Sequence, residues 1–346
     1  MNFALDRLQR FISEVLEAVG VLPKHAEVTA LRLLEADMRG RTGHGLIRVP
    51  QYVARIEAGG INLRPQITRR RESPVSALID GDNGLGQVVM SEATETAISK
   101  AKESGMAWVG TVNSNHAGAA GVYTSMALAH DLIALYFAVA SANVMPPWGG
   151  TDRLLGTNPV SIAIPAGRDT PFQLDIATTV ASHGTIAVVA QAGELMPEGW
   201  VVDFDGNPIV DPNLANEGFL MPIGGYKGSG LSIAIGLLAG VLNNAAFGSE
   251  VIDHRAVPGQ AANTGQAILA IRPDLFRDVD DFKAAMDHHL AVLRASGPAG
   301  KVQLPGEAAA RLEEQQRAMG IPVPEPVLAQ LRDLAVRFEL EDQLVS

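Results

Sequence analysis

Between residues 75 and 140, short apolar runs that favour β-strands alternate with longer stretches of helical periodicity. The runs Val75–Ile79 and Met106–Val112 are each followed by a helical stretch, at 88–104 and 118–130, and the apolar run 132–140 comes next. Because a strand or helix must bury its apolar side against another element, this alternation predicts a sheet covered by helices. We therefore expect an α/β fold.

The two ends of the chain read differently from the middle. Leu5 to Val19 carries apolar residues at helical spacing, and a second helix follows Pro23 as far as Met38. We expect a helical domain made of residues 1–74 plus 306–346, packed beside an α/β domain at 75–305. Within the latter, the uncharged run Leu231–Leu242 is too short to span a bilayer and predicts a buried core helix. The remaining predicted elements are strands at 160–164, 172–176 and 267–271, a hairpin at 201–210, and helices at 280–296, 307–319 and 324–338.

The composition excludes several classes of function. The 346 residues contain no cysteine, which excludes disulfides, thiolate metal ligands and cysteine nucleophiles and favours a reducing, cytoplasmic location. The formal net charge of -11 disfavours binding to nucleic acid, because an acidic surface repels phosphates. We expect neither a signal peptide nor a membrane anchor.

A histidine, an arginine and a tyrosine are spaced four residues apart in the first candidate site. His44, Arg48 and Tyr52 share one face if residues 44–52 form a helix, which Pro50 permits only in its first turn. Histidine can accept a hydroxyl proton near neutral pH, and arginine can hold a carboxylate through two parallel donors. A surface helix capped by a histidine remains the alternative.

Three further loops are rich in small and polar residues. Residues 113–121 follow a predicted strand and open a predicted helix, where backbone N–H groups can meet a phosphate. Residues 149–159 and 175–184 lie at predicted strand ends, and Lys227 begins a helix after a glycine pair. Ordinary connecting loops remain the alternative for the three loops, and a solvated helix start is the alternative for Lys227. No GxGxxG fingerprint, phosphate-binding Walker loop or metal-binding histidine spacing is present, so we predict no metal site.

Eight segments occur along the chain in this order: GHGLIRVPQY, IDGDNGLGQ, NSNHAGAAG, MPPWGG, LGTNP, DIATT, GGYKGSGLS and LPGE. Taken in order, they resemble the type 2 malate/L-lactate dehydrogenase family. This family includes malate, lactate, sulfolactate and ureidoglycolate dehydrogenases, diketogulonate reductase and piperideine-2-carboxylate reductase. The resemblance implies a non-Rossmann NAD(P)-binding fold, a homodimer and a small carboxylate substrate.

The resemblance also implies roles for individual residues. His44 and His116 correspond to the catalytic positions, and the division of labour between them stays open. Arg48, Tyr52, Thr157 and Thr178 correspond to substrate contacts. The implied cofactor contacts are His116, Ala117, Gly118, Ala119, Ala120, Ser141, Asp175, Ile176, Ala177, Lys227, Gly228, Pro305, Gly306 and Glu307.

Two departures from the family pattern bear on the substrate. Gly43 stands where the family usually has a serine, and Thr185 stands where the imine reductases carry an acidic residue. We therefore predict an NAD- or NADP-dependent dehydrogenase of a small 2-hydroxy acid, malate- or lactate-like or a sugar acid. The alternatives are an NADPH-dependent cyclic-imine reductase, an inactive cofactor-binding protein and a metal-dependent lyase or hydrolase.

Overall fold

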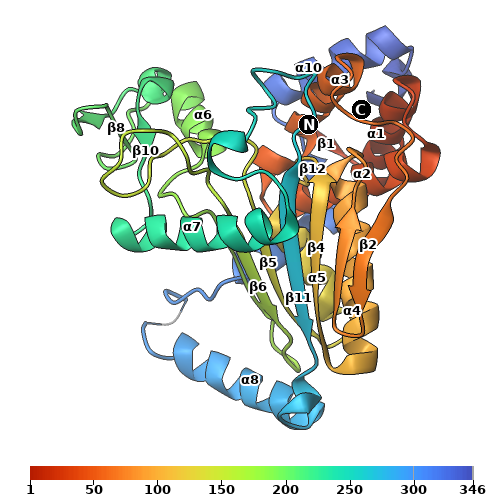
Figure 1. Ribbon diagram of the computed structural model, residues 1–346, viewed down its shortest axis with the longest axis vertical. Coiled ribbons are helices and arrows are strands. Elements are labelled where there is room, and N and C mark those ends of the chain that lie inside the picture. Colours follow the sequence, from red (N-terminus) through yellow and green to blue (C-terminus); the bar gives the residue numbers. More distant parts are fainter. Residues whose placement is uncertain (299, 345–346) are drawn as a thin grey trace.

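A seven-stranded mixed sheet forms the centre of the computed structural model, which describes residues 1–298 and 300–344 (Figure 1). Its strand order is β2-β3-β4-β11-β5-β6-β7. Only β3 and β4 run parallel, joined by the crossover helix α4 (Gly86–Ser104), and the other neighbours pair antiparallel. The expected α/β fold is confirmed, and its sheet is mixed. The strands are β2 (Thr68–Ser73), β3 (Ser76–Asp80), β4 (Met106–Ser114), β5 (Ile133–Ala138), β6 (Val160–Ile164), β7 (Phe172–Ile176) and β11 (Thr264–Ile271).

Helices cover both faces of this sheet. On one face, α4 and α5 (Ala120–Leu128) share an apolar core with residues such as Val109 and Ile268. On the other face lies α7 (Tyr226–Ala239), followed by a short 3-10 helix whose Asn243 donates to the carbonyl of Gln266 at 2.9 Å. The sheet is therefore enclosed between two helical layers.

The first and last helices of the chain share one apolar core beside the sheet. Strand β1 (Asn2–Phe3) pairs with β12 (Ile321–Pro322), so the two ends are also joined by backbone hydrogen bonds. Figure 1 shows these N-terminal and C-terminal helices gathered together on one side of the sheet. The helices of this core are α1 (Leu5–Ala18), α2 (Pro23–Met38), α3 (Val49–Glu57) and α10 (Glu325–Phe338), and α9 (Glu307–Met319) packs against α2. The predicted helical segment 306–346 includes residues 345–346, which lie outside the described residues.

A smaller lobe and a separate helix complete the molecule. The lobe combines α6 (His183–Ala192) with a three-stranded sheet and has its own small apolar core. Its strands are β8 (Val201–Val202), β9 (Pro208–Ile209) and β10 (Phe219–Leu220). The antiparallel pairing of β8 with β9 confirms the predicted hairpin. Helix α8 (Val279–Arg294) follows β11 and extends along the far end of the sheet (Figure 1). None of the described helices combines the length and apolarity needed to cross a bilayer.

Two local expectations were wrong. Residues 68–73, placed in the helical segment, form the edge strand β2, whose charged and exposed side chains suit a sheet edge. The predicted core helix at 231–242 is buried on one side only, and Leu242 is 63% exposed. The conditional helix at 44–52 begins later than His44: residues 42–48 form two 3-10 helices, and Pro50 lies in the first turn of α3, as the sequence requires.

Candidate functional site

A cavity of about 660 Å³ lies where the helical layer, the central sheet and the smaller lobe meet. Most of its walls come from five stretches of the chain that are far apart in sequence, and Thr157, Pro159 and Ile223 complete them. The five stretches are residues 40–48, the loop before α5, the segment after β5, residues 175–188 and the loop before β11. Both His44 and His116 line it, together with Arg48. The structure therefore brings together the two histidines and the arginine that the sequence singles out.

A buried carboxyl group shapes the turn that carries His44 and Arg48. The backbone N–H of Leu46 donates to Asp37 Oδ2 at 2.7 Å, which caps the 3-10 helix at Leu46–Arg48. A Cβ on Gly45 would collide with the Asp37 carboxyl, so only glycine fits in this turn. Burial raises the pKa of Asp37 to about 7, opposed by the Leu46 N–H bond. The tight turn aims His44 and Arg48 into one cavity although no continuous helix joins them.

Tyr52 contacts His116 rather than the cavity. Its hydroxyl lies 2.7 Å from His116 Nδ1 and accepts a hydrogen bond from Gln87 Nε2 at 2.6 Å. Burial raises the pKa of Tyr52 to about 12, so its phenol stays protonated and has one hydrogen to donate. Among the described residues, the acceptor within reach is His116 Nδ1. Neutral His116 therefore carries its own proton on Nε2.

Three histidine rings cluster around this point. His44 stacks on His116 with ring centroids 5.6 Å apart, and His254 meets His116 edge-on at the same separation. Burial, then the charges of Arg48 and Arg41, lowers the pKa of His44 to about 4. Burial is also the main cause that lowers the pKa of His116, and lowers that of His254 to about 3. All three rings are therefore neutral at physiological pH, and His44, whose ring makes no hydrogen bond to a described residue, can accept a proton.

Arg48 brings a positive charge to the cavity without a carboxylate partner. Its Nε donates to the carbonyl of Gly43 at 2.6 Å and its Nη1 to Gln51 Oε1 at 2.9 Å. No ion pair to Arg48 occurs among residues 1–298 and 300–344. Burial lowers the pKa of Arg48, as expected for a desolvated cation. Such a group is suited to bind an anion that enters the cavity.

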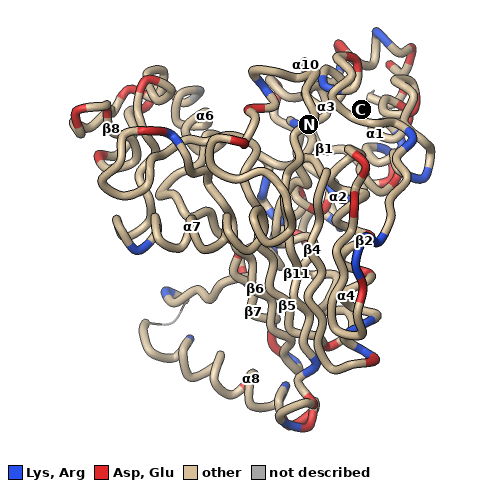
Figure 2. The backbone as a smooth tube through the Cα atoms, viewed as in Figure 1, with Lys and Arg blue, Asp and Glu red and all other residues tan. Residues whose placement is uncertain are grey.

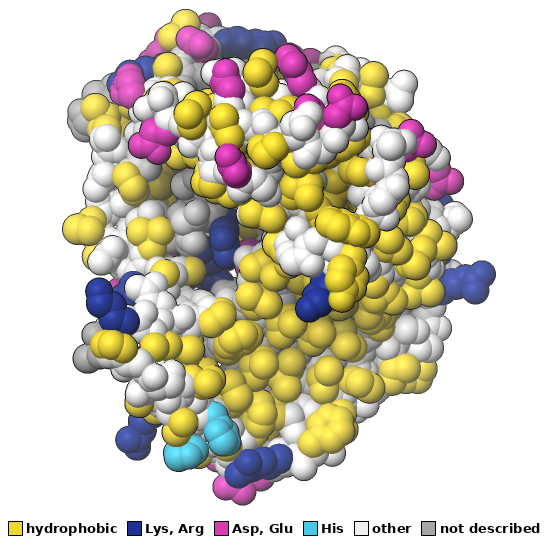
Figure 3. Space-filling model, turned by 90° about the vertical axis from the view of Figure 1, so that its left-hand side faces the viewer, with side chains coloured by type: hydrophobic (Ala, Val, Ile, Leu, Met, Phe, Trp, Pro, Cys, Tyr) yellow, Lys and Arg dark blue, Asp and Glu magenta, His cyan; other side chains and the backbone are white. Residues whose placement is uncertain are grey.

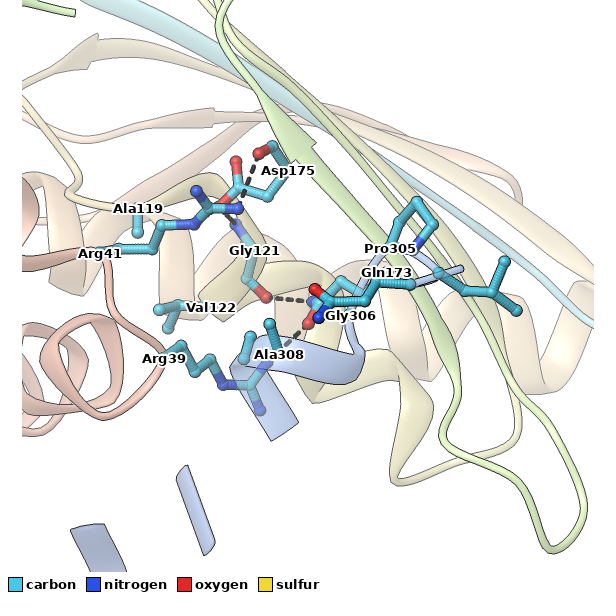
Figure 4. A pocket seen from close by; sticks show the side chains of 13 residues that line it. Arg39, Arg41, Ala119, Gly121, Val122, Gln173, Asp175, Pro305, Gly306 and Ala308 are labelled. Atoms are coloured by element: carbon cyan, nitrogen blue, oxygen red, sulfur yellow. Dashed lines mark hydrogen bonds and ion pairs between the residues drawn. The ribbon is translucent and has the colours of Figure 1, made fainter. Parts of the chain in front are cut away.

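A second cavity of about 350 Å³ adjoins the first, and Figure 4 shows its lining. The two cavities share Arg41, Ala119 and Asp175. Asp175 accepts the N–H of Gly121, in the first turn of α5, at 3.1 Å and pairs with Arg41 at 3.5 Å. Gln173 donates to the Gly121 carbonyl at 2.7 Å. The chain thus offers one long, branched space with the N-terminus of a helix at the junction.

The predicted site residues divide into three groups. The larger cavity is lined by His44, Arg48, His116, Ala117, Gly118, Ala119, Ala120, Ser141, Thr157, Asp175, Ile176 and Ala177, and the smaller one by Pro305 and Gly306 as well. Tyr52 and Thr178 are buried behind the cavity wall, where the Thr178 hydroxyl donates to the Thr157 carbonyl at 3.0 Å.

The third group lines neither cavity in the single chain. Lys227 is exposed at the start of α7, and Gly228 is buried against the backbone of Ile223. Glu307 is buried and accepts from Arg294 Nε at 2.8 Å and from the Leu304 N–H at 3.1 Å. Glu307 therefore holds the Pro305–Gly306 turn in place, and the turn itself faces the smaller cavity.

Sequence reasoning missed two adjacent residues of the larger cavity. His254 and Arg255 lie in an irregular loop before β11 and match none of the motifs considered. His254 is 2% exposed, and its Nε2 lies 3.3 Å from Ser141 Oγ. The only sequence feature that could have indicated them is the adjacency of a histidine and an arginine. Spacing alone does not show that this loop lies near His44 in the fold. His183, noted in a polar loop, instead begins α6, which Ser182 caps.

Comparison with known proteins gives a family match along nearly the whole chain. The model of the malate/L-lactate dehydrogenase family matches residues 3–332. The L-sulfolactate dehydrogenase of Methanocaldococcus jannaschii is 38% identical over 340 residues, which covers 97% of each chain. The solved structure of that enzyme superimposes with a TM-score of 0.90 at 36% identity, covering 98% of each chain.

Two further relatives carry the names of their cofactors. The (2R)-3-sulfolactate dehydrogenase (NADP(+)) of Chromohalobacter salexigens is 34% identical, covering 93% of this chain and 94% of the relative. The ureidoglycolate dehydrogenase (NAD(+)) of Escherichia coli K12 is 32% identical, covering 89% and 88%. The names of these relatives thus include both nicotinamide cofactors and more than one 2-hydroxy acid.

Proposed function

Since this chain belongs to the malate/L-lactate dehydrogenase family, we propose that its larger cavity is where a small 2-hydroxy acid is oxidised to a 2-oxo acid. The chain is a nicotinamide-dependent oxidoreductase of this class. One observation carries the assignment of the site. A cation without a carboxylate partner, Arg48, lines the same cavity as two neutral histidines, His44 and His116.

The residues around the junction of the two cavities fit a nicotinamide cofactor. The loop before α5 contains the small residues Ala117, Gly118 and Ala119, and the N-cap Ala119 makes no side-chain cap bond. The Gly121 N–H already donates to Asp175, so the other backbone N–H groups at this helix start would meet phosphate oxygens. Asp175 and the Pro305–Gly306 turn would contact the rest of the molecule. No GxGxxG turn is needed for such an arrangement, and we propose a non-Rossmann mode of binding. When bound, the nicotinamide ring supplies the hydride acceptor.

His44 is the proposed base for the substrate hydroxyl. It has no hydrogen-bond partner among the described side chains, so both of its ring nitrogens are free to face a ligand. The low pKa of about 4 keeps the ring neutral, so one nitrogen is available as a proton acceptor above that pH. His44 therefore takes the hydroxyl proton as the C2 hydride leaves.

His116 is the proposed hydrogen-bond donor to the same oxygen. The Tyr52 hydroxyl occupies its Nδ1, so its Nε2–H is the end left to donate. A donor aimed at the oxygen on C2 orients the substrate and stabilises negative charge that develops there during reduction. This proposal divides the labour between the two histidines.

Arg48 is the proposed anchor of the C1 carboxylate. Its Nε and Nη1 are tied to Gly43 and Gln51, which fixes the plane of the guanidinium group while Nη2 remains without a partner in the described chain. A charge-assisted bond from a fixed arginine places C2 of the substrate relative to His44. Thr157 lines the same cavity and would complete the pocket.

We also propose that the enzyme is a homodimer that buries α7. Leu237, Leu238 and Val241 are 45%, 39% and 55% exposed on α7 and the 3-10 helix after it. Figure 2 shows α7 free of charged residues except at one end, and Figure 3 shows a broad apolar area on this side of the molecule. Residues 228–249 carry no charge, and charge depletion of this kind is typical of the core of a protein interface.

A substrate screen tests the proposed function. The purified protein is mixed with NADH or NADPH and a panel of 2-oxo acids, sugar diketo acids and cyclic imines, and the nicotinamide absorbance is followed. We expect oxidation with at least one 2-oxo acid. Turnover of a cyclic imine alone would overturn the hydroxy-acid assignment, and cofactor binding without any turnover would favour the inactive relative.

A further inference from the structure

The larger cavity contains more positive than negative charge. Three arginines line it, Arg41, Arg48 and Arg255, against a single acidic residue, Asp175. Arg41 and Asp175 face each other at 3.5 Å, and Arg41 also donates to the Asp175 carbonyl at 2.9 Å. That pair leaves Arg48 and Arg255 as the cations of the cavity.

The ion pair that Arg255 makes within the chain is weak enough to leave its guanidinium group available to a ligand. Its one carboxylate partner among the described residues is Asp253, two residues earlier, which accepts from Arg255 Nε and Nη2 at 3.3 Å each, longer than a strong charge-assisted bond. The two side chains are 44% and 38% exposed, and an ion pair of this kind contributes little to stability. Arg255 lines the cavity whereas Asp253 does not, so the pair presents its positive member to the cavity.

The two cations lie close enough to influence the same groups. Burial lowers the pKa of His183, and the charges of Arg255 and Arg48 both act in the same direction. The positive charge of Arg255 also lowers the pKa of Arg48. His183 and Arg255 both line the cavity, and Arg255 directly follows His254, whose ring meets that of His116. Arg255 thus stands beside the histidine cluster in the cavity that Arg48 enters.

We propose that Arg255 binds a second anionic group of the substrate, so that this enzyme selects 2-hydroxy acids that carry two negative charges. A monoanion held by Arg48 would leave Arg255 without a ligand partner, while both positive charges stay in the same cavity. A carboxylate or a sulfonate on C3 would pair with the Arg255 guanidinium and relieve that repulsion. The proposal rests on the proposed function and adds the class of substrate to it.

The kinetic test compares two substrates that differ by one carboxylate, malate and lactate. In the wild-type enzyme we expect a higher kcat/KM for malate. Arg255→Gln should lower kcat/KM for malate about 10- to 100-fold, mainly through KM, and leave lactate within about twofold, because one charge-assisted bond is lost. Arg255→Lys should recover part of the loss. Sulfolactate, tested alongside, distinguishes a sulfonate from a carboxylate as the second group.

The control is Arg277→Gln, an exposed arginine outside the lining of either cavity, which should behave as wild type. Because the Arg255 side chain is 44% exposed, its variants should unfold at the wild-type temperature. Equal losses for malate and lactate in Arg255→Gln, or a wild-type enzyme that uses lactate as well as malate, would overturn the proposal.

A binding measurement keeps this inference separate from the proposed function. Calorimetry with succinate and propionate, which lack the reacting hydroxyl, requires no turnover. We expect wild-type protein to bind succinate about tenfold or more tightly than propionate, and Arg255→Gln to lose that preference. A preference that survives in Arg255→Gln contradicts the inference. Selective binding of succinate without turnover of any 2-hydroxy acid would instead contradict the proposed function alone.

Discussion

At the scale of single residues, His44 and His116 are stacked neighbours with different surroundings. The phenol of Tyr52 occupies one nitrogen of His116, whereas His44 makes no hydrogen bond to a described side chain. A ring that is free at both nitrogens can act as the base, and a ring with one occupied nitrogen acts as an oriented donor. The two roles predict different changes in kcat and KM when each histidine is replaced by alanine.

Replacement of His44 by alanine should lower kcat for oxidation by about 10²–10⁴-fold while the affinity for the nicotinamide cofactor, measured by fluorescence, changes little. His116→Ala should raise KM as well as lower kcat, because the oxygen on C2 loses its orienting donor. His288→Ala, on the exposed surface of α8, is the matched control. A His44→Ala enzyme with wild-type turnover would remove His44 from the mechanism.

The low pKa of His44 predicts an unusual pH profile. A histidine that must be neutral to act normally loses activity as the pH falls through 6.5. Here burial, Arg48 and Arg41 lower the pKa to about 4, so the ring stays neutral far below 6.5. We expect kcat/KM for oxidation to be flat from pH 8 down to about 5 and to fall only toward pH 4. An acid limb centred near 6.5 would contradict the burial of this base.

How far the site could be predicted from sequence also depends on individual residues. His44, Arg48 and His116 occur in short motifs with recognisable chemistry, and the resemblance to a family gives them roles. His254 and Arg255 occur in no such motif. They lie more than 200 residues after His44 in the sequence, and an irregular loop brings them to the same cavity. Long-range loop placement depends on packing that a spacing pattern does not encode.

At the scale of elements, Gly86 shows that a glycine in a family segment can serve packing rather than phosphate binding. Gly86 begins α4, and a Cβ there would collide with the backbone carbonyls of Asn115 and His116. The close approach of α4 to this loop therefore sets where His116 stands. The segment IDGDNGLGQ thus acts behind the cavity, and none of its residues lines it.

Gly86→Ala should consequently reduce both stability and activity. The displaced backbone would cost about 1–3 kcal/mol of unfolding free energy and move His116 away from the substrate. Chemical denaturation and kcat measured on the same sample check both effects. Ser104→Ala, at the exposed end of the same helix, is the control and should change neither. A fully active, fully stable Gly86→Ala enzyme would show that the contact is not needed.

Most elements could be predicted from periodicity, and the misses have physical reasons. The strands at 160–164 and 172–176 and the helix at 307–319 have the predicted bounds, since apolar runs or helical spacing end at clear turn residues. Strand β2 is an edge strand of charged residues and has no apolar alternation to reveal it. Helix α6 begins with the His183-Gly184 pair, which is typical of a loop in sequence.

At the scale of the whole molecule, the proposed dimer explains why the helix predicted to be buried at 231–242 has an exposed apolar side. The sequence of α7 is apolar all round, which is typical of a buried helix, yet the single chain buries only one side. A second copy would bury the other. The cytoplasmic location stays a prediction from the composition, and the division into two domains stays a proposal in which β2 belongs with the sheet.

The proposed dimer predicts that a charge on this surface will separate the subunits. Leu242→Glu, at a position 63% exposed beside α7, should convert a dimer into a monomer in sedimentation experiments at micromolar concentration. Phe276→Glu, at an exposed apolar residue of another region, should leave the dimer intact. A wild-type protein that sediments as a monomer at high concentration would refute the dimer.

The central claim is that this cavity oxidises a 2-hydroxy acid by transferring its C2 hydride directly to the nicotinamide. Malate deuterated at C2 is incubated with the enzyme and either oxidised cofactor, and the reduced cofactor is analysed by mass spectrometry. The account predicts one deuterium on each reduced nicotinamide, and the loss of this transfer in His44→Ala. Reduced nicotinamide without the label, or no reduction with this or any other deuterated 2-hydroxy acid, would contradict it.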